Sequence, residues 1–477
     1  MKANDIILAK IQSLNHNGEG VFKTKDITIF VPRGVPGDTL KVKVKKLRKN
    51  YGSGEIIAIV KPSPLRVNPE CKAFENGCGG CQWLHIDYKT QLLWKARIVN
   101  KILGVALNEN IKVLPCLGMK EPYHYRNKLS LNREDSKNSK KLGLMKENSL
   151  EIVEFDYCKQ ELESNQKAYE IIRKQRIPFS ITQIHVRSNQ KGETGIYFYA
   201  PTNTKTISNF SKELLQKIKD LKGVGLSTHN DYYHLVGEKV IKEDIGDLNY
   251  LIPINGFFQT NYTQAQQLQE IVFDLLKPTK KDKILDLYCG AGFFSLFLAK
   301  EVESVYGIEN NSSSIESAIR NAKINNITNA NFVCADVKEE IVSFRKKSID
   351  CIILDPPRVG SEIEVLDEIV KMKPKKIIYI SCSPQSLARD LKSLSHLYKI
   401  TFCKPVDMFP HTYHIEVVVK LELNASDSHK KMEVKKAEVK KTPIIIKKNF
   451  DLKKVKNIKP KENKKIILKK SKNKEKT

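Results

Sequence analysis

The stretch K-I-L-D-L-Y-C-G-A-G at residues 283–292 decides the fold of the C-terminal part of this 477-residue chain. Its first half is apolar and reads as a short buried strand. Its glycines allow a tight turn that brings a ligand close to the backbone. Further strand-like and helical runs alternate after it, up to residue 421. Repeated β-α units of this kind predict an α/β fold with a mostly parallel, doubly wound sheet.

Acidic residues follow the next strands of this predicted sheet. Glu309 ends the second strand, where it is placed to accept hydrogen bonds from ribose hydroxyls. Asp336 follows the third strand, and Asp355 ends the fourth, ahead of two prolines. NAD enzymes use a similar turn and acid, but this turn lacks the third glycine of a pyrophosphate cradle. The pattern therefore favours S-adenosylmethionine as the cofactor, with Asp336 near the adenine and Asp355 on the pocket floor.

A cysteine stands where the fifth strand stops. Cys382 follows the apolar run 376–381 and precedes a Ser-Pro turn, and Glu416 lies at the start of the later apolar run 415–421. A thiol and a carboxylate at neighbouring strand ends form a candidate pair for covalent catalysis. Taken alone, the two residues also fit a core thiol and a surface carboxylate. The neighbouring motifs favour catalysis.

The charge balance predicts the class of partner. The net charge is +28, from 82 Lys and Arg against 54 Asp and Glu, which indicates nucleic acid first and an anionic membrane second. No apolar run reaches the roughly 18 residues of a membrane span, and the first residues lack a signal peptide pattern. We therefore expect a cytoplasmic protein without a membrane partner. Its ten cysteines are then expected in metal binding or catalysis rather than in disulfides.

Residues 424–477 hold half of the net charge. This segment has 20 Lys against six acidic residues, a net charge of +14, with few aromatic residues. Such a composition predicts a disordered tail. It is read either as a tether for RNA phosphates or as a solubilising tail without a specific partner.

Residues 1–60 predict a small β-barrel. Short apolar runs separated by turn signals fit a closed barrel of the OB type, a common nucleic-acid platform. The run 40–45 alternates strictly, so its lysines share one face and its aliphatic residues the other. The segment resembles a TRAM domain, an RNA-binding barrel, in G-E-G-V at 18–21 and in V-P-R and P-G-D at 31–33 and 36–38.

Residues 61–250 are predicted as a central α+β domain with a cysteine cluster and an amphipathic helix over residues 88–103. Cys71, Cys78 and Cys81 stand close together, with two glycines between the last two, so that the backbone can fold around a metal centre. A fourth ligand is expected, and the candidates are Cys116 and Cys158. The spacing fits an iron–sulfur cluster, with zinc as the alternative.

Taken together, the motifs resemble the RNA uracil-5-methyltransferase family over about residues 1–421. They are F-Q-T-N at 258–261, the glycine-rich turn, G-I-E at 307–309, D-P-P-R at 355–358, S-C-S-P-Q-S-L-A-R-D at 381–390 and D-M-F-P-H-T-Y-H-I-E at 407–416. The resemblance implies a Rossmann-like class I methyltransferase domain over residues 251–423.

The resemblance also implies roles for single residues. It makes Cys382 the nucleophile and Glu416 the general base. It places in the donor site Gln259, Tyr288, Glu309, Asp336 and Asp355. It implies a [4Fe-4S] cluster held by Cys71, Cys78, Cys81 and Cys158, and so decides against Cys116. The first gap of this cluster is six residues long, where the family usually has five.

The activity that follows from the resemblance is the formation of 5-methyluridine in RNA. The barrel and the four cysteines favour 23S ribosomal RNA, with tRNA as the alternative, and no obligate protein partner is expected. Two other readings stay open. An amino-group methyltransferase, suggested by D-P-P, would need no catalytic thiol, and a non-catalytic RNA-binding protein would use only the barrel and the tail.

Overall fold

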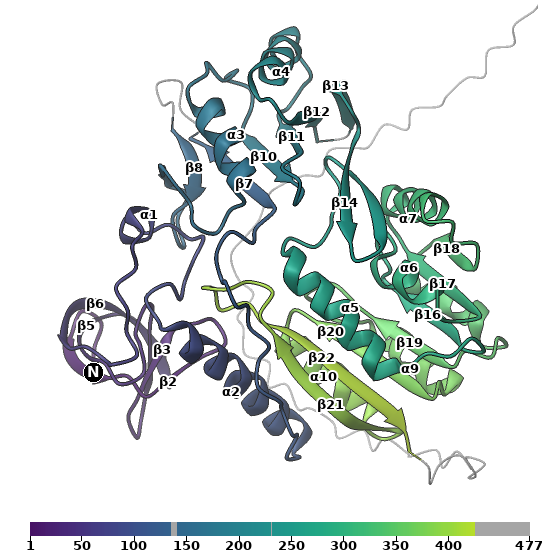
Figure 1. The fold of residues 1–477 in the computed structure, drawn as a ribbon. Coiled ribbons are helices and arrows are strands. Elements are labelled where there is room, and N and C mark those ends of the chain that lie inside the picture. The colour runs from purple at the N-terminus through teal and green to yellow at the C-terminus, as the bar shows by residue number, and fades with distance from the viewer. Residues whose placement is uncertain (135–140, 230, 425–477) are drawn as a thin grey trace, which may run out of the picture. The chain divides into compact units, whose positions relative to one another are not determined.

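The computed structural model describes residues 1–134, 141–229 and 231–424. The lysine-rich tail predicted over 424–477 therefore lies, from residue 425 on, outside the described residues. The described chain forms a six-stranded sheet, a seven-stranded sheet, a two-stranded hairpin and a second seven-stranded sheet (Figure 1). In this part of the chain, no helix combines the length and the apolar character that a bilayer crossing requires.

The N-terminal six-stranded sheet has the order β1-β5-β6-β4-β3-β2. Its strands are β1 (Ile6–Lys10), β2 (Ser13–Leu14), β3 (Gly20–Lys23), β4 (Thr28–Val31), β5 (Thr39–Leu47) and β6 (Tyr51–Lys61). In β5, Leu40, Val42 and Val44 are fully buried, whereas Lys41 is exposed and Lys43 half-buried. The alternation predicted for this strand is therefore confirmed, because successive side chains of a strand point to opposite faces.

The second sheet has the order β13-β12-β11-β10-β7-β8-β9. Its strands are β7 (Lys128–Arg133), β8 (Leu142–Met145), β9 (Ile152–Val153), β10 (Gln183–Ser188), β11 (Thr194–Tyr199), β12 (Leu221–Ser227) and β13 (Tyr232–Gly237). The helices α3 (Glu163–Arg173) and α4 (Lys205–Lys217) share one hydrophobic core with it. Two short elements flank this unit, α1 (Lys72–Glu75) and the hairpin of β14 (Val240–Ile245) and β15 (Leu248–Pro253).

The C-terminal sheet has the order β18-β17-β16-β19-β20-β22-β21. The first five strands are parallel, and β22 is antiparallel to both of its neighbours. The strands are β16 (Lys283–Leu287), β17 (Ser304–Glu309), β18 (Ala330–Cys334), β19 (Cys351–Leu354), β20 (Lys376–Ser381), β21 (Tyr398–Val406) and β22 (Glu416–Leu423). The predicted, mostly parallel α/β sheet is confirmed. The strand order reverses beside β16, where such sheets bind their ligands.

Helices cover both faces of this sheet (Figure 1). They are α5 (Tyr262–Leu276), α6 (Phe293–Ala299), α7 (Ser312–Ile324), α8 (Val337–Glu340), the 3-10 turn η1 (Ile341–Phe344), α9 (Ile363–Met372) and α10 (Pro384–Leu394). Ile352 of β19 packs in the core that contains α9 and α10, while its neighbour Ile353 packs in the core that contains α5 and α6. Both faces of the strand are therefore buried, which explains its continuous apolar run.

Helix α2 (Tyr88–Leu107) links the earlier part of the chain to this sheet. The helix begins at Asp87, whose side chain accepts a hydrogen bond from the N–H of Thr90. Its buried residues Ile98, Val99 and Leu103 belong to the same hydrophobic core as α9 and α10. The predicted helix is therefore present, and it packs as part of the C-terminal core although it lies in the segment predicted as the central domain.

Candidate active site

Cys382 and Glu416 occupy the ends of two paired strands. β20 and β22 pair Ser381 with Val417, so Cys382 and Glu416 are the next residues outward along the two antiparallel strands. Cys382 is half-buried, and Ser383, directly after it, caps the N-terminus of α10 through its side chain. The thiol therefore sits in a strand-to-helix turn at the carboxyl edge of the parallel sheet.

Charged groups around this turn shift the pKa values of Cys382 and Glu416. The pKa of the Cys382 thiol is raised to about 11, mainly by burial and also by the carboxylates of Glu416 and Asp355, while the Arg358 guanidinium opposes the rise. Burial, followed by the charge of Asp355, raises the pKa of Glu416 well above its usual range, and Arg358 opposes this shift. The ends of β19, β20 and β22 thus place four titratable groups in one electrostatic cluster.

The carboxyl group of Asp286, in β16 beside β19, acts on Asp355. Burial and the charge of Asp286 raise the pKa of Asp355 to about 7. Asp286 is fully buried in β16, where burial raises its pKa to about 7 against the hydrogen bonds from Ser295, whose hydroxyl lies 2.5 Å from Oδ2. The other oxygen of Asp286 has no hydrogen-bond partner within the described residues. Both carboxyl groups therefore bind a proton more tightly than exposed carboxylates do.

The glycine-rich turn lies between β16 and α6. Gly290 and Gly292 have positive φ angles of 53° and 83°, which glycine adopts without strain. The N–H of Gly290 donates to Glu309 Oε2 at 3.3 Å, and the N–H of Asn311 donates to Oε1 at 2.9 Å. Tyr288, at the same turn, also has a positive φ angle, and its hydroxyl lies 3.2 Å from Ser361 Oγ. The structure therefore brings Glu309 and the turn together, as predicted.

Two predicted donor-site residues have structural contacts of a different kind. Asp336 is exposed and caps α8, accepting a hydrogen bond from the N–H of Lys338 at 2.9 Å. Gln259 is half-buried in the loop before α5, and its carbonyl accepts a hydrogen bond from Asn127 Nδ2 at 2.9 Å. The predicted roles of both residues in cofactor binding stay predictions.

Sequence reasoning did not select two residues that shape this cluster, Asp286 and Arg358. Both stand inside quoted motifs, Asp286 in the run before the glycine-rich turn and Arg358 at the end of D-P-P-R. Their influence depends on burial and on distances between strand ends, which the sequence does not contain. The signal that was available is their place in motifs at or just after the carboxyl ends of the neighbouring strands β16 and β19.

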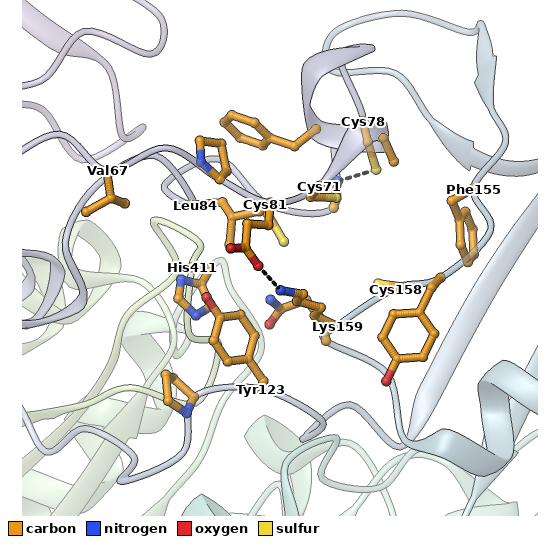
Figure 2. Close-up of a pocket in the computed structure, with 18 of the residues that line it drawn as sticks. Val67, Cys71, Cys78, Cys81, Leu84, Tyr123, Phe155, Cys158, Lys159 and His411 are labelled. Atoms are coloured by element: carbon orange, nitrogen blue, oxygen red, sulfur yellow. Dashed lines mark hydrogen bonds and ion pairs between the residues drawn. The ribbon is translucent and has the colours of Figure 1, made fainter.

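The four predicted cluster cysteines line one cavity of about 360 Å³ (Figure 2). They are Cys71, Cys78, Cys81 and Cys158. The lining residues do not include Cys116, whose surroundings contain Lys95 and Asp407 instead. The structure therefore brings together the four cysteines that the resemblance implied and leaves the other candidate apart.

The half-buried guanidinium of Arg126 lies beside these thiols. Arg126 donates through Nη2 to the carbonyl of Gly80 at 2.9 Å. The pKa of Cys81 is raised to about 12, mainly by burial and also by the neighbouring Cys78 and Cys71, while Arg126 opposes the rise. Burial also raises the pKa of Cys158, again against Arg126. The guanidinium therefore favours the thiolate forms, which are the forms that bind metals.

The cavity, as the described residues line it, does not have the geometry of a single-ion metal site. Among residues 1–134, 141–229 and 231–424, no group of three or more His, Cys, Asp or Glu side chains is arranged to hold a metal ion. A [4Fe-4S] cluster needs a different arrangement of ligands, because each cysteine sulfur binds a different iron atom and the four sulfurs need not converge on one point. Two buried polar atoms of lining residues, Gln160 Oε1 and His411 Nε2, have no partner in the described chain. The donor set fits a cluster, and the assignment stays a prediction.

Comparison with known proteins identifies the family. Residues 235–424 match the family model described as tRNA (Uracil-5-)-methyltransferase, and residues 3–57 match the TRAM domain. The chain is 32% identical over 456 residues to an uncharacterized RNA methyltransferase of Bacillus cereus, a match that covers 89% of this chain and 98% of the relative. It is 33% identical over 449 residues to an uncharacterized RNA methyltransferase of Clostridium acetobutylicum, covering 88% and 97%.

One solved structure resembles most of the chain. It is the tRNA (uracil-54, C5)-methyltransferase of Pyrococcus abyssi in complex with S-adenosyl-L-homocysteine. The TM-score is 0.69 and the identity 30%, and the match covers 87% of this chain and all of that one. The chain therefore belongs to the RNA uracil-5-methyltransferase family, and it is an S-adenosylmethionine-dependent RNA methyltransferase with an N-terminal TRAM domain.

Proposed function

We propose that this enzyme forms 5-methyluridine in RNA through a covalent bond between Cys382 and C6 of the target uracil. The observation that carries the proposal is that Cys382 and Glu416 directly follow the last paired residues of β20 and β22, Ser381 and Val417, and that Glu416 and Asp355 both act on the charge of Cys382. Uracil C5 is a poor nucleophile by itself. Attack of the Cys382 thiolate on C6 moves the electrons of the C5=C6 bond toward C5 and the C4 carbonyl.

The remaining steps follow from the same chemistry. Bound S-adenosylmethionine supplies the methyl group as an electrophile to C5. Glu416 then takes the proton from C5, and the electrons of that C–H bond reform the double bond and expel the Cys382 thiolate. Because burial and Asp355 raise the pKa of Glu416, its carboxylate is a stronger base than an exposed one. The uracil must leave any base stack to reach this edge.

For the methyl donor, we assign a site along the glycine-rich turn. Its proposed contacts are Gln259, Tyr288, Glu309, Asp336 and Asp355. Each oxygen of Glu309 already accepts one backbone N–H and keeps a lone pair for a ribose hydroxyl. Asp355 lies within the charge cluster of Cys382 and Glu416, so it is suited to hold either the donor or the uracil.

The decisive experiment uses RNA in which 5-fluorouridine replaces uridine. After methyl transfer, Glu416 cannot remove fluorine as a cation, so the bond between Cys382 and the RNA persists. We expect a protein–RNA adduct on denaturing gels that needs the methyl donor to form fully and that is absent from Cys382→Ala. The matched control is Cys334→Ala, which removes an exposed thiol. An amino-group methyltransferase or a non-catalytic RNA-binding protein would form no such adduct.

We further propose that Cys71, Cys78, Cys81 and Cys158 hold a [4Fe-4S] cluster. Support comes from the single cavity that they line and from the nearby Arg126 guanidinium, which offsets negative charge. Protein purified without oxygen is expected to contain iron and sulfide in the ratio of this cluster, and Cys158→Ser is expected to lose both. Cys116→Ser is the control and should keep them. Zinc instead of iron would contradict the assignment.

Of the RNA substrates, we propose 23S ribosomal RNA, with tRNA as the second candidate. The TRAM domain and the four cysteines support the ribosomal substrate. The similarity to the Pyrococcus abyssi enzyme, which is described as a tRNA (uracil-54, C5)-methyltransferase, favours tRNA. Mass mapping of 5-methyluridine in both RNAs from a deletion strain distinguishes them, since the modification disappears only from the true substrate. A cytoplasmic location belongs to the same proposal.

A further inference from the structure

The loop that connects β21 to β22 leads to Glu416, the first residue of β22. Its main-chain carbonyl groups accept hydrogen bonds from residues elsewhere in the chain. Five successive carbonyl groups, those of residues 407–411, each accept a hydrogen bond from another part of the chain. The donors are Gln264 Nε2 at 3.2 Å, Asn261 Nδ2 at 3.0 Å, Lys95 Nζ at 3.2 Å, Tyr125 Oη at 3.0 Å and the N–H of Trp83 at 2.9 Å. The path of this loop is therefore set by groups outside the sheet.

Helix α2 supplies two of the strongest contacts. Gln91 and Lys95 are one helical turn apart, and neither has any exposed surface. Lys95 Nζ forms an ion pair with Asp407 in addition to its bond to Phe409. Gln91 Oε1 accepts a hydrogen bond from the N–H of His411 at 3.0 Å, and its Nε2 lies 3.1 Å from His411 Nδ1. We call Gln91 and Lys95 the α2 clamp.

The backbone at the clamped position is strained. His411 has a φ angle of 63°, which residues other than glycine rarely adopt and which persists only when surrounding contacts hold it. Its ring stacks on Tyr123 with centroids 4.6 Å apart. A buried ion pair such as Lys95–Asp407 adds little stability over a well-packed apolar pair, but it fixes the direction of its partners. The main effect of the α2 clamp is therefore on the backbone path of residues 407–411 rather than on the stability of the fold.

We propose that Gln91 and Lys95 are positioning residues for Glu416. They hold residues 407–411, and the chain has only four more residues before Glu416 faces Cys382. The inference rests on the proposed function, in which Glu416 takes the proton from C5. The clamp itself touches no substrate and is distinct from the catalytic residues.

The order of steps gives this role a specific signature. Addition of Cys382 to C6 and methyl transfer to C5 both precede the removal of the C5 proton. A displaced Glu416 therefore slows only the last step, the elimination that frees the RNA. The methylated RNA then stays attached to Cys382. A residue with a merely structural role would lower the fraction of active enzyme and would reduce attached and released product together.

The test compares Gln91→Met and Lys95→Met with Lys101→Met, which alters an exposed lysine of the same helix. Gln91→Met introduces no unpaired charge, so it decides the matter even where Lys95→Met does not fold. Each full-length variant is incubated with uridine-containing RNA and donor carrying a tritiated methyl group. For Gln91→Met we expect kcat to fall about tenfold to a hundredfold with KM for RNA within about twofold, and label to stay on the protein in denaturing gels. Lys101→Met should behave as wild type.

Glu416→Gln serves as the reference for retained label. An unchanged kcat in folded Gln91→Met, or a lower kcat without retained label, overturns the positioning role when Glu416→Gln does retain label. If Glu416→Gln itself retains none, the proposed role of Glu416 is wrong, and the inference drawn from it falls too. The two failures are therefore distinguishable by one gel.

Discussion

Cys382 differs from the four cysteines of the cavity in the charges that surround it. The carboxylates of Glu416 and Asp355 raise the pKa of Cys382, and the nearby cation, Arg358, is exposed. In the cavity the sulfurs lie near one another and beside the Arg126 guanidinium, which opposes the rise in the pKa of Cys81. The surroundings of Cys382 fit the proposed nucleophile, which adds to uracil and is later expelled. The surroundings of the cavity cysteines fit thiolates that stay bound to a metal centre.

The comparison teaches that burial alone does not identify the task of a cysteine. Burial is the largest cause of the raised pKa in both regions. The distinction lies in the partners, which are carboxylates in one region and neighbouring thiols with a cation in the other. A carboxylate beside a single sulfur fits the proposed proton transfer, whereas several sulfurs around one cavity fit the proposed cluster.

Among the predicted effects on activity, the largest is expected from removing the thiol of Cys382, and it should differ clearly from the effect of removing a cavity cysteine. We expect Cys382→Ala to lose all methyl transfer, because it removes the proposed nucleophile, the thiol next to the Ser381–Val417 pair of β20 and β22. Cys158→Ser should lose the cluster but still form the adduct with 5-fluorouridine RNA in those molecules that fold. Transfer of labelled methyl groups and denaturing gels measure both. Equal and complete loss in folded Cys158→Ser would show that the two regions are not separate in function.

Glu416→Gln is expected to have the next largest effect. The amide keeps the size of the side chain but cannot take the C5 proton, so turnover should fall by about 10²- to 10⁴-fold. Steady-state kinetics and the fraction of RNA attached to protein measure the change. Loss of RNA attachment together with turnover would instead assign Glu416 to an earlier step.

The pH dependence sharpens the contrast between thiols. The thiolate is the reactive form, and the pKa of Cys382 is raised to about 11. Below that pKa the thiolate fraction rises about tenfold for each pH unit, so alkylation of Cys382 by iodoacetamide should speed up about a hundredfold between pH 7 and pH 9. Peptide mass analysis separates Cys382 from Cys81. A rate that is flat over this range would mean that Cys382 is already ionised.

Arg358→Ala should have the smallest effect of the four. Arg358 lowers the pKa of Cys382, so its removal should reduce the thiolate fraction and slow adduct formation at pH 7 by about threefold to tenfold, since exposed charges are screened. Raising the pH should restore part of the rate. Arg358→Lys is the matched control because it keeps the positive charge. A loss that pH does not restore would indicate direct contact with RNA instead.

Local sequence patterns predicted several parts of this site. Apolar runs and turns predicted the strand that leads to Cys382 and the glycine-rich turn beside Glu309, because strand ends and tight turns have signals within a few residues. The alternation in β5 was also readable, with Leu40 inside and Lys41 outside. The expected α/β class follows from the same kind of local information.

Contacts between distant segments were not readable in this way. Lys95 looks in the sequence like one of several lysines on an amphipathic helix, but it is fully buried against Asp407, more than 300 residues later. Asp286 likewise acts on Asp355 only because β16 and β19 are neighbours in the sheet. Neither pairing leaves a local pattern.

The amino-acid sequence by itself determined which residues end the strands, since the hydrophobic period and the turn residues act over short distances along the chain. Only the tertiary structure decided which of those ends face one another, because strand order and helix packing depend on the burial of all faces at once. It brought Cys382 and Glu416 to the adjoining ends of β20 and β22, placed four cysteines around one cavity, and joined the α2 clamp to the loop that leads to Glu416.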